Sequence, residues 1–414
     1  SQALAAIGGS AFNLINMFVN VSNGAITASM VVLSQDVGSG KRDDCRNNFK
    51  TSLTIVLFIA LSITALYYFN CQKFLILLRV PADNLAISTQ YLQAYCFGFL
   101  PNMTVLMIIN MLRGLGESKR PTILLIALYL MNILSDFIFI VLLKLGILGV
   151  SLSFITTQSI MALYLLRMIH IDYGVFGKNS KFELSILKRV LLIGIPASTT
   201  SFLYQLTSAT LQTAINGLGS VAVAGYVINN KVENIFWILM ASLGVAMTNV
   251  VAQNYGAKKY NRVKKSLSSG LAVSFAFTVS LNTFIFIFVR PLVMMFSHEA
   301  EVIEQAVSIL VFLQPMLLAY AVVEPFFALF NGLGKAIYST VVTIFGVVIV
   351  RIAWVVLYAA KTGSVNTILF AFPLSWITVS LIYALLYWII KKKFLKDDDT
   401  ITEEKSMAEN IANA

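Results

Sequence analysis

The sequence predicts an all-α polytopic membrane protein, and three observations carry that prediction. Of its 414 residues, 58% are hydrophobic and only 12% are charged, whereas soluble globular chains carry about 25% charged residues. Apolar runs of about 20 residues, the length that a helix needs to cross the ~30 Å hydrocarbon core of a bilayer, recur along the chain. An internal repeat divides these runs into two sets. We therefore expect two parallel six-helix repeats, of which eleven spans are present here.

Each expected span is a helix, because in lipid the backbone polar groups must be satisfied within the segment. The expected spans lie at 7–33, 49–69, 87–112, 121–143, 149–171, 189–216, 220–252, 267–289, 303–331, 338–360 and 365–390.

Basic residues in the connections between spans predict the orientation. Most of the 30 Lys and Arg residues fall in alternate connections, and the opposite side holds only Lys73, Arg79, Lys144, Arg290 and Lys361. The positive-inside rule assigns the basic side to the cytoplasm. Loops 34–48, 113–120, 172–188 and 253–266 and the C-terminus are therefore expected to be cytoplasmic, in the plasma (cell inner) membrane. The net charge of +11 comes from basic residues in the loops that set the orientation in the membrane, so no nucleic-acid partner is expected.

The second half of the sequence restates the first at a constant shift. Gln35-Asp-Val-Gly-Ser-Gly-Lys41 corresponds to Gln253-Asn-Tyr-Gly-Ala-Lys-Lys259, and Gly114-Leu-Gly116 to Gly332-Leu-Gly334. Both copies of each motif lie on the predicted cytoplasmic side, which indicates parallel repeats. At the same shift, the span at 189–216 has no counterpart in the first half. We expect that the first repeat lacks its opening helix and that the full protein has twelve spans; an eleven-helix protein is the alternative.

The repeat and the positions of the spans predict four regions. They are an N-terminal lobe at 1–172 (spans 2–6 of the full protein), a cytoplasmic linker at 173–187, a C-terminal lobe at 188–392 (spans 7–12), and a cytoplasmic tail at 393–414.

One carboxylate lies within an otherwise apolar span. Asp136 follows Asn132 by four residues in the run 121–143, so the two side chains lie on one face of a helix. A charged Asp at the middle of a membrane helix costs about 2.5–3.5 kcal/mol, so it needs a partner, a proton or a bound cation. Asp136 with Asn132 can take up H⁺ or contribute oxygens to Na⁺. A structural role near the membrane interface is the alternative.

A series of motifs follows a fixed order: SQDVGSGKRDD, NMLRGLGESKRPTILL, NILSD and GILGVSLS in the first half, and IGIPAS, INGLGSVAVAGY, AQNYGAKKYNRVKK and NGLGKA in the second. In this order the motifs resemble a known family, the multidrug and toxic compound extrusion (MATE) transporters of the MOP flippase superfamily. The resemblance covers essentially the whole chain.

The resemblance implies a secondary active antiporter, not an enzyme, that exports organic cations and drugs from the cytoplasm in exchange for H⁺ or Na⁺. Its two lobes would form a V around a central cavity. The implied partners are small-molecule organic cations or drugs and the lipid bilayer. No cofactor beyond the coupling ion is expected, and a monomer is expected.

The resemblance also suggests roles for particular residues. It places Asn132 and Asp136 in a cation site of the N-lobe, with Na⁺ as one possible ion. That site in the family also uses an Asp on the first helix, which this chain does not contain, and a Thr where this chain has Phe154. Thr156, Thr157 or Gln158 is the expected substitute for that Thr, each on a different face of the helix.

In the C-lobe, the family's coupling Glu on the seventh helix is replaced by Gln205, whose amide cannot titrate. Gln205, Glu324, Lys231 and Arg351 are candidate residues of a substrate cavity, together with Thr157 and Gln158. For Glu324, a static ion pair with Arg351 or Lys231 is the alternative, because buried charges pair.

Other classes are disfavoured. GSGKR at 38–42 lacks the first Gly and the final Ser or Thr of a phosphate-binding loop, which excludes a nucleotide site of that kind. A flippase for lipid-linked saccharides would need a strongly cationic cavity, and only Lys231 and Arg351 are available. A non-transporting membrane scaffold is the third class.

Overall fold

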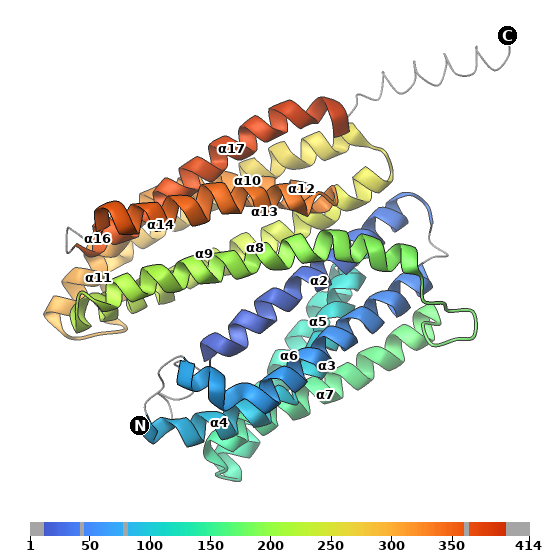
Figure 1. Ribbon diagram of the computed structural model, residues 1–414, viewed down its shortest axis with the longest axis horizontal. Coiled ribbons are helices and arrows are strands. Elements are labelled where there is room, and N and C mark those ends of the chain that lie inside the picture. The colour runs from blue at the N-terminus through green and yellow to red at the C-terminus, as the bar shows by residue number, and fades with distance from the viewer. Residues whose placement is uncertain (1–11, 42–44, 78–81, 360–363, 395–414) are drawn as a thin grey trace. The chain divides into compact units, whose positions relative to one another are not determined.

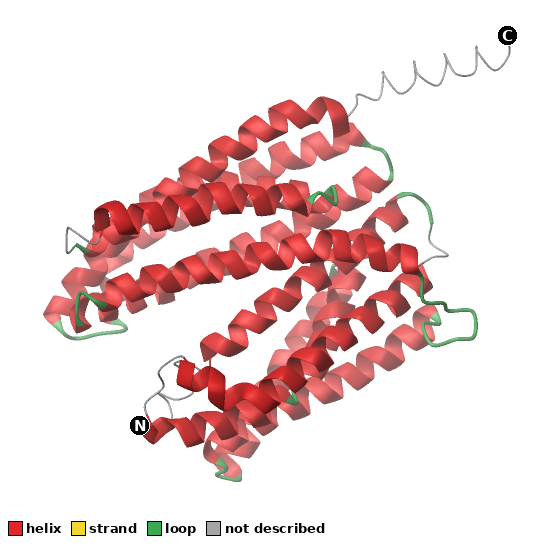
Figure 2. Ribbon diagram, viewed as in Figure 1, coloured by secondary structure: helices red, strands yellow, loops and turns green. Residues whose placement is uncertain are grey.

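The computed structural model describes residues 12–41, 45–77, 82–359 and 364–394, and this part of the chain is almost entirely helical (Figures 1 and 2). No strand occurs among these residues. The all-α fold class is therefore confirmed. The predicted tail, apart from Lys393 and Phe394, lies outside the described residues, as do residues 7–11 of the first predicted span.

The chain forms two compact units, residues 1–199 and 200–414. The core of the first unit is one cluster that includes Phe49, Tyr67, Phe99 and Met103. Its helices are α2 (Phe12–Gly38), α3 (Cys45–Leu77), α4 (Ala82–Cys96), α5 (Phe99–Gly114), α6 (Lys119–Asp136), the π-helix η3 (Phe137–Leu142), α7 (Gly146–Tyr173) and the first part of α8 (Leu184–Asn216).

The second unit begins within α8, and its largest core cluster includes Phe236, Phe330 and Tyr383. The helices after α8 are α9 (Ser220–Gly256), α10 (Tyr260–Met294), α11 (Ala300–Leu313), the 3₁₀ turn η4 (Gln314–Met316), α12 (Leu317–Gly332), α13 (Ala336–Thr343), the π-helix η5 (Ile344–Ile349), α14 (Val350–Trp354), the π-helix η6 (Val355–Ala359), α16 (Val365–Leu369) and α17 (Ala371–Phe394).

The outward faces of these helices are apolar. Within the described residues, nine helices are long and apolar enough to cross a membrane, and a tenth span is formed if the bent pair of α4 and α5 counts as one. That pair bends by 47° at Phe97-Gly98, between the two helices. Large apolar side chains such as Phe58, Phe69 and Leu163 lie on the outer surface, as expected of side chains that face lipid. The chain is thus a multi-pass membrane protein, as predicted.

The sequence repeat has a counterpart in the backbone packing. A side-chain carbon at Gly114 would lie 3.1 Å from the carbonyl oxygen of Met30, and one at Gly332 would lie 2.7 Å from that of Thr248. The pairs Gly114–Met30 and Gly332–Thr248 are related by the shift that relates the two sequence motifs. Small residues, glycine above all, let two helix backbones approach closely, so the GLG motifs are contact points between helices. The twelve-helix complement stays a prediction.

The segment between α7 and α8 is held against α3. Lys50 donates to the carbonyl of Ser180 (2.7 Å), and Asn47 donates to Glu183 (2.5 Å). Just beyond it, Arg189 of α8 pairs with Asp36 of α2 at 2.6 Å, and Asn48 donates to the same carboxylate at 2.8 Å. The predicted division into lobes at a linker over 173–187 stays a prediction.

Replacing the glycine at one of these contacts tests the packing. We expect Gly332→Ala to destabilise the protein by about 1–3 kcal/mol, the usual cost of overpacking a tight core. The added methyl group would meet backbone and Val251 at 2.7 Å. The thermal unfolding midpoint in detergent would fall. Gly217→Ala is the control, because its nearest contact is 3.4 Å away. Equal midpoints for the two variants would contradict this account of the GLG motif.

Candidate functional site

The predicted N-lobe residues lie on two neighbouring helices of the first unit. Asp136 is the last residue of α6, directly before the π-helix, and its side chain is half-buried. One turn earlier, the amide of Asn132 lies 3.5 Å from the hydroxyl of Ser153 on α7. Thr157 is buried and donates to the carbonyl of Ser153 at 2.7 Å. Ser153, a residue that the sequence reasoning missed, thus contacts Asn132 through its hydroxyl and Thr157 through its backbone carbonyl.

Two other α7 residues, Phe154 and Gln158, lie near this group of polar side chains in the sequence. Phe154, which replaces the family's Thr, stacks on Tyr95 with ring centroids 4.3 Å apart. An oxygen of Gln158 is buried and has no hydrogen-bond partner within the protein. The polar atoms near α6 therefore come from Asn132, Ser153 and Thr157, and the aromatic ring of Phe154 packs on α4.

In the second unit, Glu324 of α12 is bound by a tyrosine that packs against two tryptophans. The hydroxyl of Tyr320 donates to its carboxylate at 2.9 Å. The other carboxylate oxygen lies against Gly244 of α9, where a side-chain carbon would clash with it. Gly244 therefore provides the space that the carboxylate occupies. Among the described residues, Glu324 forms no ion pair.

The rings that pack on Tyr320 come from two further helices. Trp237 of α9 contacts Tyr320 edge-on at 4.8 Å, and Trp376 of α17 lies 5.8 Å from Tyr320 and 6.1 Å from Trp237. We call Trp237, Tyr320 and Trp376 the aromatic cluster. A carboxylate bound by a tyrosine of an aromatic cluster is an arrangement that attracts an organic cation, because both a negative charge and aromatic rings favour it.

Arg351 of α14 is 3% exposed and is stabilised without a carboxylate. Its Nε donates to the hydroxyl of Ser375 at 3.0 Å, and a terminal nitrogen lies 3.4 Å from the hydroxyl of Thr207. The guanidinium also lies over the ring of Phe372, 4.5 Å from its centroid. The alternative of a static Glu324–Arg351 or Glu324–Lys231 pair is wrong, because hydroxyls and a ring face hold Arg351 while Tyr320 holds Glu324.

The two remaining predicted residues are not in the interior of the unit. Lys231 is exposed, and its ammonium lies 5.4 Å from the centroid of the Phe296 ring. Gln205 is also exposed on α8. The structure therefore brings neither side chain to Glu324. The rings of the aromatic cluster were the residues that sequence reasoning missed, since nothing local to Trp237 or Trp376 indicates that they meet Tyr320.

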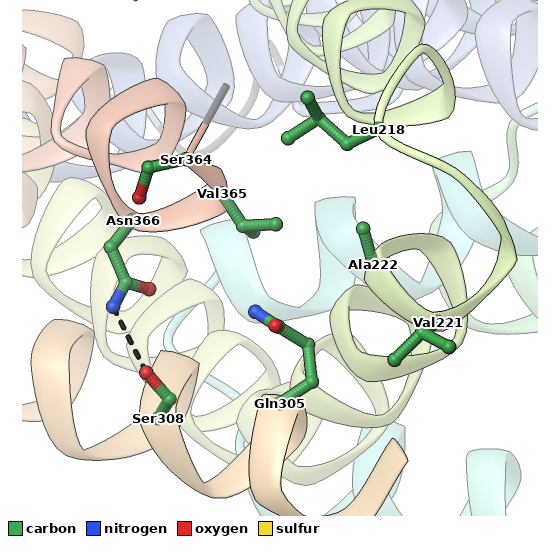
Figure 3. Close-up of a pocket in the computed structure, with 8 residues that line it drawn as sticks. All are labelled: Leu218, Val221, Ala222, Gln305, Ser308, Ser364, Val365 and Asn366. Carbon is green, nitrogen blue, oxygen red and sulfur yellow. Dashed lines mark hydrogen bonds between the residues drawn. The ribbon is translucent and has the colours of Figure 1, made fainter. Parts of the chain in front are cut away.

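A separate pocket lies in the same unit, between the α8–α9 connection, α11 and α16 (Figure 3). It measures about 400 Å³, and Asn366 donates to Ser308 across one side of it at 3.0 Å. Its lining residues are Leu218, Val221, Ala222, Gln305, Ser308, Ser364, Val365 and Asn366. None of them is charged, so this pocket offers an organic cation no counter-charge.

Fold and site together define a class: a multi-pass helical membrane protein with isolated charged side chains inside its spans, the usual mark of a substrate or ion pathway. A family model described as MatE matches residues 1–138 and 196–357, more than half of the chain. The chain belongs to the MatE family.

The chain is similar to the probable multidrug resistance protein YoeA of Bacillus subtilis, with 25% identity over 409 residues that cover 95% of this chain and 87% of YoeA. It is also similar to the probable multidrug resistance protein NorM of Thermotoga maritima, with 24% identity over 295 residues, 67% of this chain and 62% of that protein.

Solved structures show the same fold. One described as an outward-facing multidrug resistance MATE family transporter of the MOP superfamily superposes with a TM-score of 0.87 at 17% identity, covering 96% of this chain and 89% of that one. A MOP superfamily transporter from Pyrococcus furiosus, whose description reports a binding pocket of reversed polarity, gives the same TM-score, identity and coverage.

The stabilisation of Arg351 by neutral partners can be tested directly. We expect Ser375→Ala to destabilise the protein by about 1–3 kcal/mol, because it leaves a buried donor of a charged group unsatisfied. The measurement is the thermal unfolding midpoint in detergent. Ser280→Ala is the matched control, since that exposed hydroxyl bonds only within its own helix, to Ala276 at 2.8 Å. An unchanged midpoint for Ser375→Ala would show that the hydroxyl is not needed.

Proposed function

We propose that this protein is a secondary active antiporter that exports organic cations, drugs among them, from the cytoplasm in exchange for H⁺ or Na⁺. Membership of the MatE family supports transport, and the names of the relatives YoeA and NorM, both probable multidrug resistance proteins, support the substrate class. The predicted orientation places the exporter in the plasma membrane with its basic loops in the cytoplasm.

The position of Glu324 is the observation that carries the substrate class. Its carboxylate has a phenol donor, Tyr320, and no cationic partner among the described residues. An organic cation that reaches it gains a counter-charge and the faces of the aromatic cluster, in surroundings where both interactions are strong because water is scarce. The rings contribute flat surfaces rather than fixed donors, which suits ligands of varied shape.

Asp136 is the residue that we propose for coupling. Its carboxylate is half-buried at the end of α6, and the oxygens of Asn132, Ser153 and Thr157 lie on the same pair of helices. A proton or Na⁺ on Asp136 removes the cost of a free carboxylate inside the membrane. An ion that binds one conformation better than another shifts the population of the two, and this differential affinity would couple the ion gradient to export.

Removing the charge of Glu324 tests the substrate site. We expect Glu324→Gln to bind ethidium at least tenfold more weakly, which corresponds to about 1.4 kcal/mol, because the amide keeps the shape and loses the counter-charge. Fluorescence anisotropy on purified protein in detergent measures the affinity. Glu304→Gln is the control, since that carboxylate is exposed and pairs with Arg290 at the surface. Equal affinities for wild type and Glu324→Gln would place the substrate site elsewhere.

Asp136→Asn tests coupling. The full-length protein in proteoliposomes, preloaded with ethidium, is given a H⁺ or a Na⁺ gradient in separate experiments. We expect the variant to bind ethidium with wild-type affinity and to lose gradient-driven efflux, and the gradient that drives the wild type identifies the ion. Asp172→Asn, at a carboxylate paired with Arg120, should transport normally. Normal efflux by Asp136→Asn would make Asp136 structural.

The same vesicles distinguish the flippase alternative. A fluorescent lipid-linked saccharide that crosses the bilayer without any ion gradient, while ethidium does not, would favour a flippase. The structure offers little for an anionic lipid pyrophosphate, because among the described residues Arg351 is the one cation that is fully buried. If the vesicles transport neither ethidium nor the lipid-linked saccharide, a membrane scaffold is favoured.

A further inference from the structure

A groove of about 350 Å³ lies between α9 and α10 in the second unit, near the ends that the basic connection joins. We call it the α9–α10 groove. Its lining side chains come from residues 243–250 of α9 and 262–273 of α10. The proposed substrate and coupling sites use none of these lining residues. The predicted orientation places this end of the two helices at the cytoplasmic surface.

Close packing of the two helices gives the α9–α10 groove a floor. The sulfur of Met247 occupies the space that a side chain at Gly270 would need, and both residues are buried and line the groove. Further along, the hydroxyl of Ser274 lies 3.5 Å from the sulfur of Met240. The two helices therefore run antiparallel in direct contact, and the groove follows them lengthwise.

The groove is basic at one end and apolar at the other. Arg262, Lys265 and Ser269 line it at spacings of three and four residues, which places them on one face of α10. Val273 continues that face, and Val250 lines the groove from α9. Both valines are exposed, as expected of side chains that face lipid. The stretch from Arg262 to Val273 covers about 16 Å of helix, so one elongated ligand can contact both ends.

The charge of the basic end is not neutralised by the described chain. Residues 234–289 contain no Asp or Glu and five Lys or Arg residues, all within 258–265. Neither Arg262 nor Lys265 forms an ion pair with a described residue. Both lie in the first two turns of α10, whose first turn contains no acid. The start of a helix is itself partially positive, so this end of the groove favours an anion.

The equivalent face of the first unit is covered by the chain itself. At the shift of the repeat, Lys265 corresponds to Asn47 and Arg262 to Asp44. The backbone amide of Lys181 donates to Asn47 at 2.8 Å, so the segment between α7 and α8 lies on that face of α3. In the second unit, no described residue outside α9 and α10 lines the groove. The second repeat thus leaves this face open and carries two cations where the first has an acid and an amide.

The ligand that fits this groove is anionic at one end and apolar over the rest. An anionic phospholipid has both parts: its phosphate suits Arg262 and Lys265, and an acyl chain suits the exposed valines. Basic pockets between membrane helices at the cytoplasmic surface bind anionic headgroups in this way. An acidic peptide fits less well, because its backbone polar groups would lie unsatisfied beside lipid-facing side chains.

We propose that the α9–α10 groove is a binding site for an anionic phospholipid, with the headgroup at Arg262 and Lys265 and an acyl chain running toward Val273. The lipid comes from the leaflet that faces the basic loops. The inference concerns lipid binding alone and does not depend on which compounds the protein exports or on its coupling ion.

Native mass spectrometry of the purified full-length protein tests the site. We expect the wild type to bind dioleoyl phosphatidylglycerol about tenfold more tightly than dioleoyl phosphatidylcholine, the factor expected of two basic side chains near an anionic headgroup. The double variant Arg262→Gln, Lys265→Gln should bind the two lipids equally. The matched control is Lys258→Gln, Lys259→Gln, which removes two charges from the same connection without touching the groove and should keep the preference.

A second variant tests the apolar part and leaves every charge in place. Ala246 lines the groove and is exposed, so Ala246→Phe fills the groove without disturbing the core. It should weaken phosphatidylglycerol binding about tenfold, the effect of displacing two methylene groups of an acyl chain. Ala241→Phe is its control, because Ala241 is exposed on the same helix and does not line the groove.

Three results would overturn the proposal. The first is a wild type that binds both lipids equally, or a preference that the two double variants change to the same extent. The second is competition by glycerol 3-phosphate at the concentrations at which phosphatidylglycerol binds, which would make a free phosphate the ligand. The third concerns the acidic tail. If Asp397→Asn, Asp398→Asn and Asp399→Asn together raise the affinity for phosphatidylglycerol tenfold, the tail rather than a lipid is the occupant of the groove.

Discussion

Charged side chains held away from water are the constraint on which the second unit depends. A charge inside a lipid-embedded bundle must find compensation from the protein, a ligand or a proton. Arg351 is compensated by hydroxyls and by the ring of Phe372, and Glu324 by Tyr320 and the space above Gly244. Because the acids and Arg351 do not neutralise one another, the carboxylates keep their capacity to bind cations. The charges therefore organise the unit and also provide its chemistry.

The two repeats share their packing but not their charges. The glycine contacts at Gly114 and Gly332 occur at equivalent positions, and both halves contain π-helical segments after the GLG motif. At the same shift, however, Glu324 corresponds to Leu106 and Asp136 to Trp354. A duplicated backbone thus carries a different polar group in each unit. This separation allows an ion and an organic molecule to be bound by different parts of one chain.

Much of the fold was predictable, because lipid imposes length and hydropathy on every span, and the spacing of Asn132 and Asp136 placed them on one helical face. The surroundings of Glu324 were not predictable, since its rings come from α9, α12 and α17. The alternative of an ion pair between Glu324 and Arg351 or Lys231 was wrong, because charge alone does not specify geometry.

The π-helical turns have a consequence for Arg351. This residue lies in α14, a short α-helical stretch between η5 and η6. A π turn holds one more residue than an α turn, so converting either segment to α-helix shifts the register by one residue, a rotation of about 100°. Arg351 would then turn away from Ser375 although neither end of the helix has moved far. The two π-helical segments therefore fix the direction in which this buried cation points.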